Sequence, residues 1–239
     1  MIHLALAIGA AVIVVAVLML LKVSLWLALP LGILAGAALF IYLGRQVQKG
    51  LESIFERAGA HLRKQQFDPA IAVMKEGYAF ASRQFLVKGS IDGQIGVIQY
   101  MRQKNEEAEP LLKSAAMNHY IAKSMLAILQ WKRGEKAECR KTFELALKSG
   151  KKESVLYGVY AYLLVEMKDR DRALSVLGEG LRHCKGDERL QSNLTALQNG
   201  KPMKMKVFGD QWYQFLLERP VIRQEPPPYA RVSKRALRG

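Results

Sequence analysis

The most constraining feature of this sequence is a pair of apolar stretches at its N-terminus, residues 2–21 and 24–43. Neither stretch contains an acidic side chain, and the only Lys or Arg before Gly44 is Lys22, which lies between them. At a rise of about 1.5 Å per residue, a helix of this length matches a hydrocarbon core roughly 30 Å thick. The sequence therefore predicts two transmembrane helices in residues 1–44, joined by a tight turn into an antiparallel hairpin.

Small residues in both stretches favour close packing of the two helices, among them Gly9 in the first and Gly32 and Gly36 in the second. Gly32 and Gly36 also form a GxxxG pair, for which packing within the hairpin and dimerisation both remain open. A cleaved signal peptide is disfavoured because no Lys or Arg precedes Ile8.

The net charge of +15 is unevenly distributed and predicts the orientation of the chain. Residues 1–44 contribute +1, residues 45–200 contribute +8 and residues 201–239 contribute +6. Loops rich in Lys and Arg stay on the cytoplasmic side of a membrane, and five basic residues follow the second stretch closely: Arg45, Lys49, Arg57, Arg63 and Lys64. We therefore expect the rest of the chain, and both termini, to be cytoplasmic. Two unspaced cysteines, Cys139 and Cys184, agree with a reducing compartment.

A recurring pattern of small residues organises the middle of the chain. Apolar residues recur at helical spacing between residues 51 and 198, which predicts an all-α domain. Four small residues lie 38, 31 and 34 residues apart: Ala70, Ala108, Cys139 and Ala173. Another small residue lies twelve positions before each of them: Ala58, Gly96, Ala127 and Ala161. A larger apolar residue lies four positions after each of them: Met74, Leu112, Phe143 and Leu177.

This pattern, over residues 51–186, resembles the tetratricopeptide repeat (TPR) family, in which small residues pair across two antiparallel helices of a repeat of about 34 residues. The resemblance implies a right-handed α-solenoid of about four helix pairs in residues 45–200, with a capping helix at residues 187–198. The first two repeats lack the turn glycine that Gly134 supplies in the third, and the proline that usually closes a repeat is absent. A generic helical bundle is the alternative.

In the TPR family the first helix of each pair lines a concave groove that holds a segment of a protein partner. The resemblance places eight residues on this groove: Val97, Tyr100, Met101, Ile128, Trp131, Lys132, Tyr162 and Glu166. Only Lys132 is suited to gripping a terminal carboxylate, so we expect apolar anchors on the partner. Packing of Tyr100 and Trp131 between repeats is the alternative.

The last segment, residues 201–239, is aromatic, proline-rich and basic. Its aromatic cluster is predicted to dock, either on the chain's own helices or on a partner, and consists of Phe208, Trp212, Tyr213 and Phe215. On its own helices, the cluster would seal their C-terminal end or fill the groove. Three prolines at 226–228 favour an exposed spacer. The basic residues that follow are expected to attract anionic lipid: Arg231, Lys234, Arg235 and Arg238.

No catalytic or metal-binding pattern accompanies these features. The histidines His3, His61, His119 and His183 have no ligand spacing, and no phosphate-binding loop occurs. We therefore predict a protein that is not an enzyme, has no cofactor or metal, and takes no small-molecule substrate.

These predictions together describe a multi-pass TPR adaptor or scaffold on the cytoplasmic face of a bacterial inner membrane. Its partners would be membrane lipid and a protein whose identity the sequence leaves open. The overall plan is loosely similar to HemY-type inner-membrane TPR proteins. Two alternatives remain: a structural subunit of a secretion, pilus, motility or envelope complex, or a binder of nucleic acid or anionic lipid through the basic tail.

Overall fold

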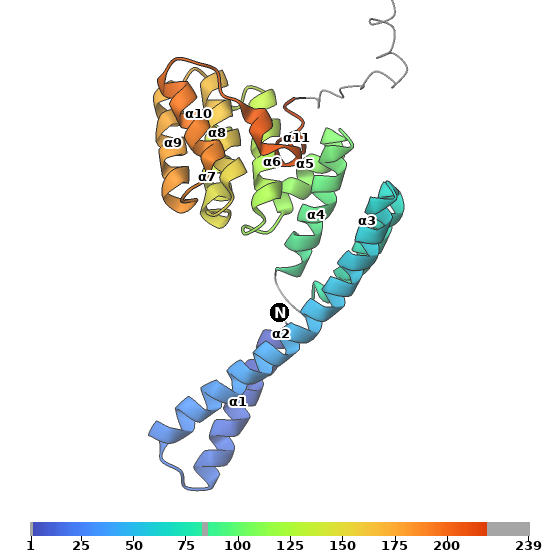
Figure 1. The fold of residues 1–239 in the computed structure, drawn as a ribbon. Coiled ribbons are helices and arrows are strands. Elements are labelled where there is room, and N and C mark those ends of the chain that lie inside the picture. Colours follow the sequence, from blue (N-terminus) through green and yellow to red (C-terminus); the bar gives the residue numbers. More distant parts are fainter. Residues whose placement is uncertain (1, 83–85, 219–239) are drawn as a thin grey trace, which may run out of the picture.

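A computed structural model describes residues 2–82 and 86–218 of the chain (Figure 1). These residues form helices joined by turns and contain no β-strand. The predicted all-α class is therefore confirmed, as are the two apolar helices at the N-terminus. The predicted spacer at 226–228 lies outside the described residues, as do the basic residues Arg231, Lys234, Arg235 and Arg238.

The two N-terminal helices form the elongated hairpin at one end of the molecule (Figure 1). α1 spans Ile2–Leu20 and α2 spans Leu25–Arg63, and both are long and apolar enough to cross a membrane. Their outward side chains are largely uncovered, Trp26 for example being 89% exposed. Apolar surface of this extent, on helices of this length, indicates association with a membrane.

Glycines close the hairpin. Gly32 and Gly36 are buried against α1, where a Cβ added at Gly36 would lie 2.8 Å from the Ala7 carbonyl oxygen. A Cβ added at Gly32 would lie 2.9 Å from the Ala11 carbonyl oxygen. Only residues without a side chain allow backbones to approach this closely. The GxxxG pair therefore serves packing within the hairpin, which is one of the two roles left open by the sequence.

α2 is longer than the sequence predicts. The second transmembrane helix was expected to end at Leu43, but α2 continues without interruption to Arg63. Gly44 does not break the helix, because an isolated glycine costs only about 1 kcal/mol relative to alanine. The residues after it are mostly good helix formers, including Arg45, Gln46 and Gln48. One helix thus links the hairpin to the rest of the molecule.

The remaining helices are shorter and pack as neighbours in chain order, with α3 on α2, α5 on α4, α7 on α6, α9 on α8 and α10 on α9. Their bounds are α3 Phe67–Glu76, α4 Val87–Met101, α5 Asn105–Ser114, α6 Tyr120–Lys132, α7 Lys136–Ser149, α8 Ser154–Glu166, α9 Arg170–His183 and α10 Glu188–Gln198. A 3-10 helix, η1 (Gly77–Phe80), follows α3.

The predicted small residues lie where the helices of each pair meet. All eight are buried: Ala58, Ala70, Gly96, Ala108, Ala127, Cys139, Ala161 and Ala173. The larger residues four positions on are buried as well: Met74, Leu112, Phe143 and Leu177. Small side chains on facing helices allow the two backbones to close, and larger ones fill the seam with the next pair.

The turns within the four pairs share a backbone conformation that the sequence did not reveal. Gln65, Gln103, Gly134 and Lys168 have φ angles of 58°, 62°, 82° and 65°, so each adopts the left-handed region. Only Gly134 enters this region without steric cost. The missing turn glycines are therefore replaced by Gln65 and Gln103 in the same conformation.

The core of the helical domain is divided into two clusters. One lies among α2, α3 and α4 and includes Val47, Ile71 and Ile91. The other extends from α4 to α10 and includes residues of the C-terminal segment. A buried carboxylate joins η1, α4 and α5, because Asp92 accepts hydrogen bonds from Tyr78 Oη at 2.5 Å and from Ser114 Oγ at 2.8 Å. Burial raises the pKa of Asp92, but hydrogen bonds, including one from Lys88, lower it overall.

The chain after α10 returns across the domain. α10 follows the N-cap residue Asp187 and ends before Asn199 and Gly200, within the range predicted for the capping helix. Two short helices follow, η2 (Met205–Phe208) and α11 (Asp210–Tyr213). We refer to residues 203–218 as the groove segment, because they lie against the predicted groove residues of α4 and α8.

Candidate protein-binding groove

The predicted groove residues come from three helices, α4, α6 and α8, that follow one another as the first members of their pairs. Tyr100 and Ile128 are fully buried, whereas Val97, Trp131 and Tyr162 are half-buried. Met101, Lys132 and Glu166 are exposed at the edge. The face is therefore apolar along its middle and polar at its rim.

The groove segment is anchored at its far end on Tyr100. The Tyr100 hydroxyl donates a hydrogen bond of 2.5 Å to the backbone carbonyl of Phe215, and the Phe215 side chain is fully buried. Burial raises the pKa of Tyr100, so this hydroxyl keeps its proton as the donor. The contact joins residues 115 positions apart in the sequence.

A second anchor is the indole of Trp212, which is fully buried. The ring of Tyr162 meets it edge-on, with the ring centroids 5.1 Å apart. The indole nitrogen donates to Glu218 Oε2 at 3.1 Å, so its polar atom is satisfied within the groove segment. Edge-to-face aromatic pairs stabilise the contact by more than the burial of their apolar area alone.

A third anchor lies on α8 and α10. Phe208 and Met205 cover Gly158, where an added Cβ would come within 2.7 Å of the Phe208 ring. The Arg189 guanidinium lies 5.3 Å from the centroid of that ring. These contacts require a glycine at position 158, because any side chain there would occupy the space of Phe208.

The backbone of the groove segment is fixed at its start by a buried amide. Asn193 Oδ1 accepts a hydrogen bond from the Lys204 N–H at 2.6 Å, while Asn193 Nδ2 donates to the Arg189 carbonyl at 2.9 Å. Because both ends of this buried amide are paired, it fixes where along α10 the groove segment begins.

Charge plays a minor part in the groove. Lys132 Nζ lies 5.7 Å from the centroid of the Tyr100 ring, and burial lowers the pKa of this lysine. The segment held in the groove is attached through aromatic rings and backbone hydrogen bonds. The arrangement is suited to holding an apolar, irregular segment of polypeptide.

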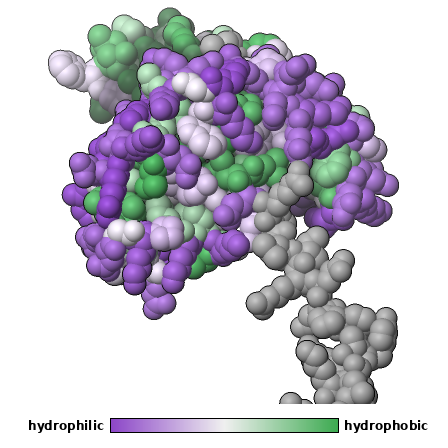
Figure 2. Space-filling model, turned by 90° about the horizontal axis from the view of Figure 1, so that it is seen from above, coloured by the Kyte–Doolittle hydropathy of each residue, from purple (hydrophilic) through white to green (hydrophobic). Residues whose placement is uncertain are grey.

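Of the aromatic residues singled out in the sequence, Phe208, Trp212 and Phe215 are buried and Tyr213 is half-buried. They pack on the chain's own helices, in the same cluster as Val97, Ile128, Trp131 and Tyr162. The groove segment thus lies on the face to which α4 and α8 contribute Tyr100 and Tyr162. Figure 2 shows small apolar patches on an otherwise mainly hydrophilic face of the domain.

Sequence reasoning missed three residues that hold the groove segment: Gly158, Arg189 and Asn193. Gly158 carried a usable signal, because a glycine inside an apolar helix often marks a close approach of another part of the chain. Nothing in the sequence pattern distinguishes Asn193, whose role depends on where Lys204 returns.

No group of three or more metal-ligating side chains occurs in the described ranges 2–82 and 86–218. Burial raises the pKa of the Cys139 thiol to about 11, so this cysteine is protonated at neutral pH and acts as a small apolar residue.

No model of a known protein family matches this chain, and no curated protein is significantly similar to it.

Proposed function

We propose that the protein is a membrane-anchored adaptor or scaffold that assembles a protein complex at the cytoplasmic face of a bacterial inner membrane. In this proposal the helix pairs from the second half of α2 to α9 form a right-handed TPR-like solenoid capped by α10. The buried small residues within the pairs support it, as does the left-handed residue in each pair's turn.

The observation that carries the proposal is the way the predicted groove holds the groove segment. Three aromatic or aliphatic anchors and two hydrogen bonds to backbone atoms attach an irregular stretch of polypeptide to one face of the helices. A segment of a partner with the same spacing of apolar anchors would satisfy the same contacts. Partner and groove segment would then compete for one site, so binding would require release of residues 203–218.

Anchoring at the membrane follows from the hairpin and from the continuity of α2. The five basic residues after Leu43 favour a cytoplasmic domain, because a loop with this many Lys and Arg residues resists translocation. Such a domain would be displayed at a fixed position over the membrane, as a scaffold requires.

A second candidate is a structural subunit of a larger membrane complex. A hollow of about 570 Å³ on the hairpin favours it, since its apolar lining would accept a transmembrane helix of another protein: Trp26, Leu29, Pro30, Ile33 and Leu34. Binding of nucleic acid through the basic tail stays a prediction from the sequence, because Arg231, Lys234, Arg235 and Arg238 lie outside the described residues.

The adaptor proposal is tested by photocrosslinking in intact cells from position Met101, whose side chain is 48% exposed at the edge of the groove. We expect this position to capture a protein partner. Combining Trp131→Ala with Val97→Ala should reduce capture several-fold, because both substitutions remove half-buried apolar surface from the groove. Combining Trp212→Ala with Phe215→Ala should increase capture, because the competing groove segment loses its anchors.

Two controls make the result specific. Gln211→Ala changes an exposed residue of the groove segment and should leave capture unchanged, and a photoreactive residue at the exposed Lys141 of α7 should not capture the same partner. Circular dichroism checks that each variant keeps its helicity. If Met101 crosslinks only to residues 203–218, in the released variant as in the wild type, the groove is not a partner site.

A further inference from the structure

The helical domain is held close to the end of the hairpin at which α1 begins. The Ile2 N–H donates a hydrogen bond of 3.3 Å to the carbonyl of Ser82, the second residue after η1. Phe80 in η1 also packs on α2, within 2.8 Å of a Cβ added at Gly50. Because the apolar stretch of α1 starts at Ile2, Ser82 lies at the level where the hydrocarbon core would end.

In this placement, one end of each later helix pair lies on the side of the hairpin. α4 begins near Ser82, and consecutive helices run in alternate directions, so the turns before α6, α8 and α10 lie on the side of the domain nearer the hairpin (Figure 1). We call residues 113–119, 148–153 and 182–188 the membrane-side turns. The turns at the opposite ends of the same helices are residues 101–107, 132–138 and 166–172, which we call the distal turns.

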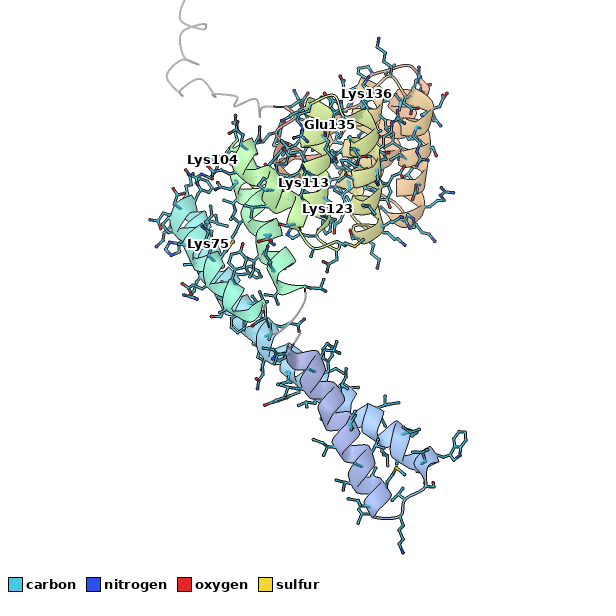
Figure 3. All side chains as sticks on the ribbon, turned by 180° about the vertical axis from the view of Figure 1, so that it is seen from behind. Lys75, Lys104, Lys113, Lys123, Glu135 and Lys136 are labelled. Atoms are coloured by element: carbon cyan, nitrogen blue, oxygen red, sulfur yellow. The ribbon has the colours of Figure 1, made fainter. Side chains whose placement is uncertain are left out.

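The two sets of turns differ in charge. The membrane-side turns carry six basic and three acidic residues, whereas the distal turns carry eight and seven. Figure 3 shows Lys123 closer to the hairpin than Lys136, which lies toward the far end of the domain.

The basic residues of the two sets also differ in their partners. Four of the eight distal basic residues form ion pairs within the protein: Arg102 with Asp68 at 2.6 Å, Lys104 with Glu107, Arg133 with Glu109 and Glu135, and Arg172 with Glu144. On the membrane side, five exposed basic residues form no ion pair with any described residue: Lys148, Lys151, Lys152, Arg182 and Lys185. Their charge is therefore available to a partner of opposite sign.

An exposed apolar side chain lies on the same side of the domain as these basic residues. Met117, in the first membrane-side turn, is 73% exposed. It borders a hollow of about 260 Å³ whose other walls include Leu145, Lys123 and Lys148. An exposed apolar side chain beside an exposed lysine, as Met117 lies on the same hollow as Lys148, suits the boundary between lipid headgroups and acyl chains.

We propose that the membrane-side turns dock on the anionic phospholipid surface of the membrane that the hairpin spans. The excess of unpaired positive charge on the side facing the bilayer matches the negative potential of such a surface. This contact holds the domain against the membrane and leaves the face that carries the groove segment accessible. It is independent of whether the groove binds a partner.

The test uses the full-length protein in nanodiscs of phosphatidylcholine, with or without phosphatidylglycerol, and follows amide hydrogen exchange. We expect residues 148–153 to exchange several-fold more slowly when phosphatidylglycerol is present, and the difference to disappear at high salt. The combined variant Lys148→Gln, Lys151→Gln and Lys152→Gln should lose the slow exchange.

The matched control removes three lysines from the distal turns, Lys104→Gln, Lys136→Gln and Lys168→Gln, and should keep the lipid effect. Unchanged exchange in α6 shows that both variants remain folded. Equal exchange in the two kinds of nanodisc would overturn the proposal, as would the same loss in both variants. Protection that requires an added acidic protein would assign this surface to a protein partner and also overturn it.

Discussion

At the scale of single residues, Asp187 shows how one side chain fixes the start of a helix. Its carboxylate accepts hydrogen bonds from the N–H groups of Arg189 and Leu190 at 3.0 and 3.1 Å, and pairs with the Arg189 guanidinium at 2.6 Å. Burial raises its pKa, but hydrogen bonds from Arg189, Ser154 and the Leu190 N–H outweigh burial and lower the pKa to about 2.

The lowered pKa makes stability depend on pH in a known direction. Because the pKa of Asp187 falls from 3.8 to about 2 on folding, its stabilisation is present above pH 3.8 and is lost as the pH falls through about 2. Asp187→Asn keeps the N-cap oxygen but removes the charge, so we expect it to lower the free energy of unfolding by about 1–2 kcal/mol at neutral pH.

Thermal unfolding in detergent at a series of pH values measures this difference. The wild type and Asp187→Asn should converge in stability as the pH approaches 2. A difference that stays constant down to that pH would show that the charge of Asp187 does not stabilise the fold.

Residues of the left-handed turns make a related point. Gln65, Gln103 and Lys168 adopt the conformation that glycine provides at position 134. A non-glycine residue in this region is strained by roughly 1–2 kcal/mol, which packing of the flanking helices must offset. The helix pairs therefore determine these turns, and the local sequence does not.

At the scale of elements, the hairpin shows how two apolar helices would pack in lipid. The hydrophobic effect would not bring them together there, since lipid is as apolar as the helix surfaces, so close van der Waals contact is needed. Gly36 faces α1, where an added Cβ would lie 3.0 Å from the Cβ of Ala11. A Cβ added at Gly9 would have no atom within 4 Å. Gly36 is therefore packed against the other helix, whereas Gly9 is open.

This difference gives a matched pair of substitutions. Gly36→Leu should destabilise the hairpin by about 1–3 kcal/mol, because the added side chain forces α1 and α2 apart. Gly9→Leu should have little effect, because the site is open. Unfolding in mixed detergent micelles measures both, and equal effects of the two substitutions would refute the packing of Gly36 against α1.

The continuity of α2 is the other feature at this scale. A single helix of 39 residues extends about 58 Å and connects the apolar hairpin to the pairing site of α3. Its apolar first half packs on α1 through Gly32 and Gly36, and its second half packs on α3 through Ala58. Because the helix has no break, the apolar hairpin and the first helix pair share one continuous helix.

At the scale of the whole molecule, the proposed orientation in the membrane can be tested directly. Alkaline phosphatase inserted in the turn at Lys22 should be active, because that turn would be periplasmic. A green fluorescent protein fused after Gly239 should fluoresce, because the C-terminus would be cytoplasmic. Replacing Arg45 and Lys49 by glutamine should reduce the share of molecules in this orientation. An active phosphatase at the C-terminus would reverse the assignment.

Much of the architecture could be predicted from local patterns. The lengths of the two apolar stretches predict the hairpin, because a bilayer of fixed thickness requires about 20 apolar residues per helix. The spacing of small residues from Ala58 to Ala173 predicts where helices approach each other, since only small side chains let backbones close. Both signals involve residues that are near one another in the sequence, so they can be recognised without the structure.

The tertiary structure decided what depends on residues far apart in the chain. Tyr100 was predicted to lie in the groove, but its hydrogen-bond partner, Phe215, is 115 residues away. Gly158 gains its role from Phe208, and Asn193 gains its role from Lys204. The sequence by itself thus determined a pair of long apolar helices and later helices with small residues at their crossings. Only the tertiary structure showed that residues 203–218 cover the groove, because contacts between distant residues have no period in the sequence.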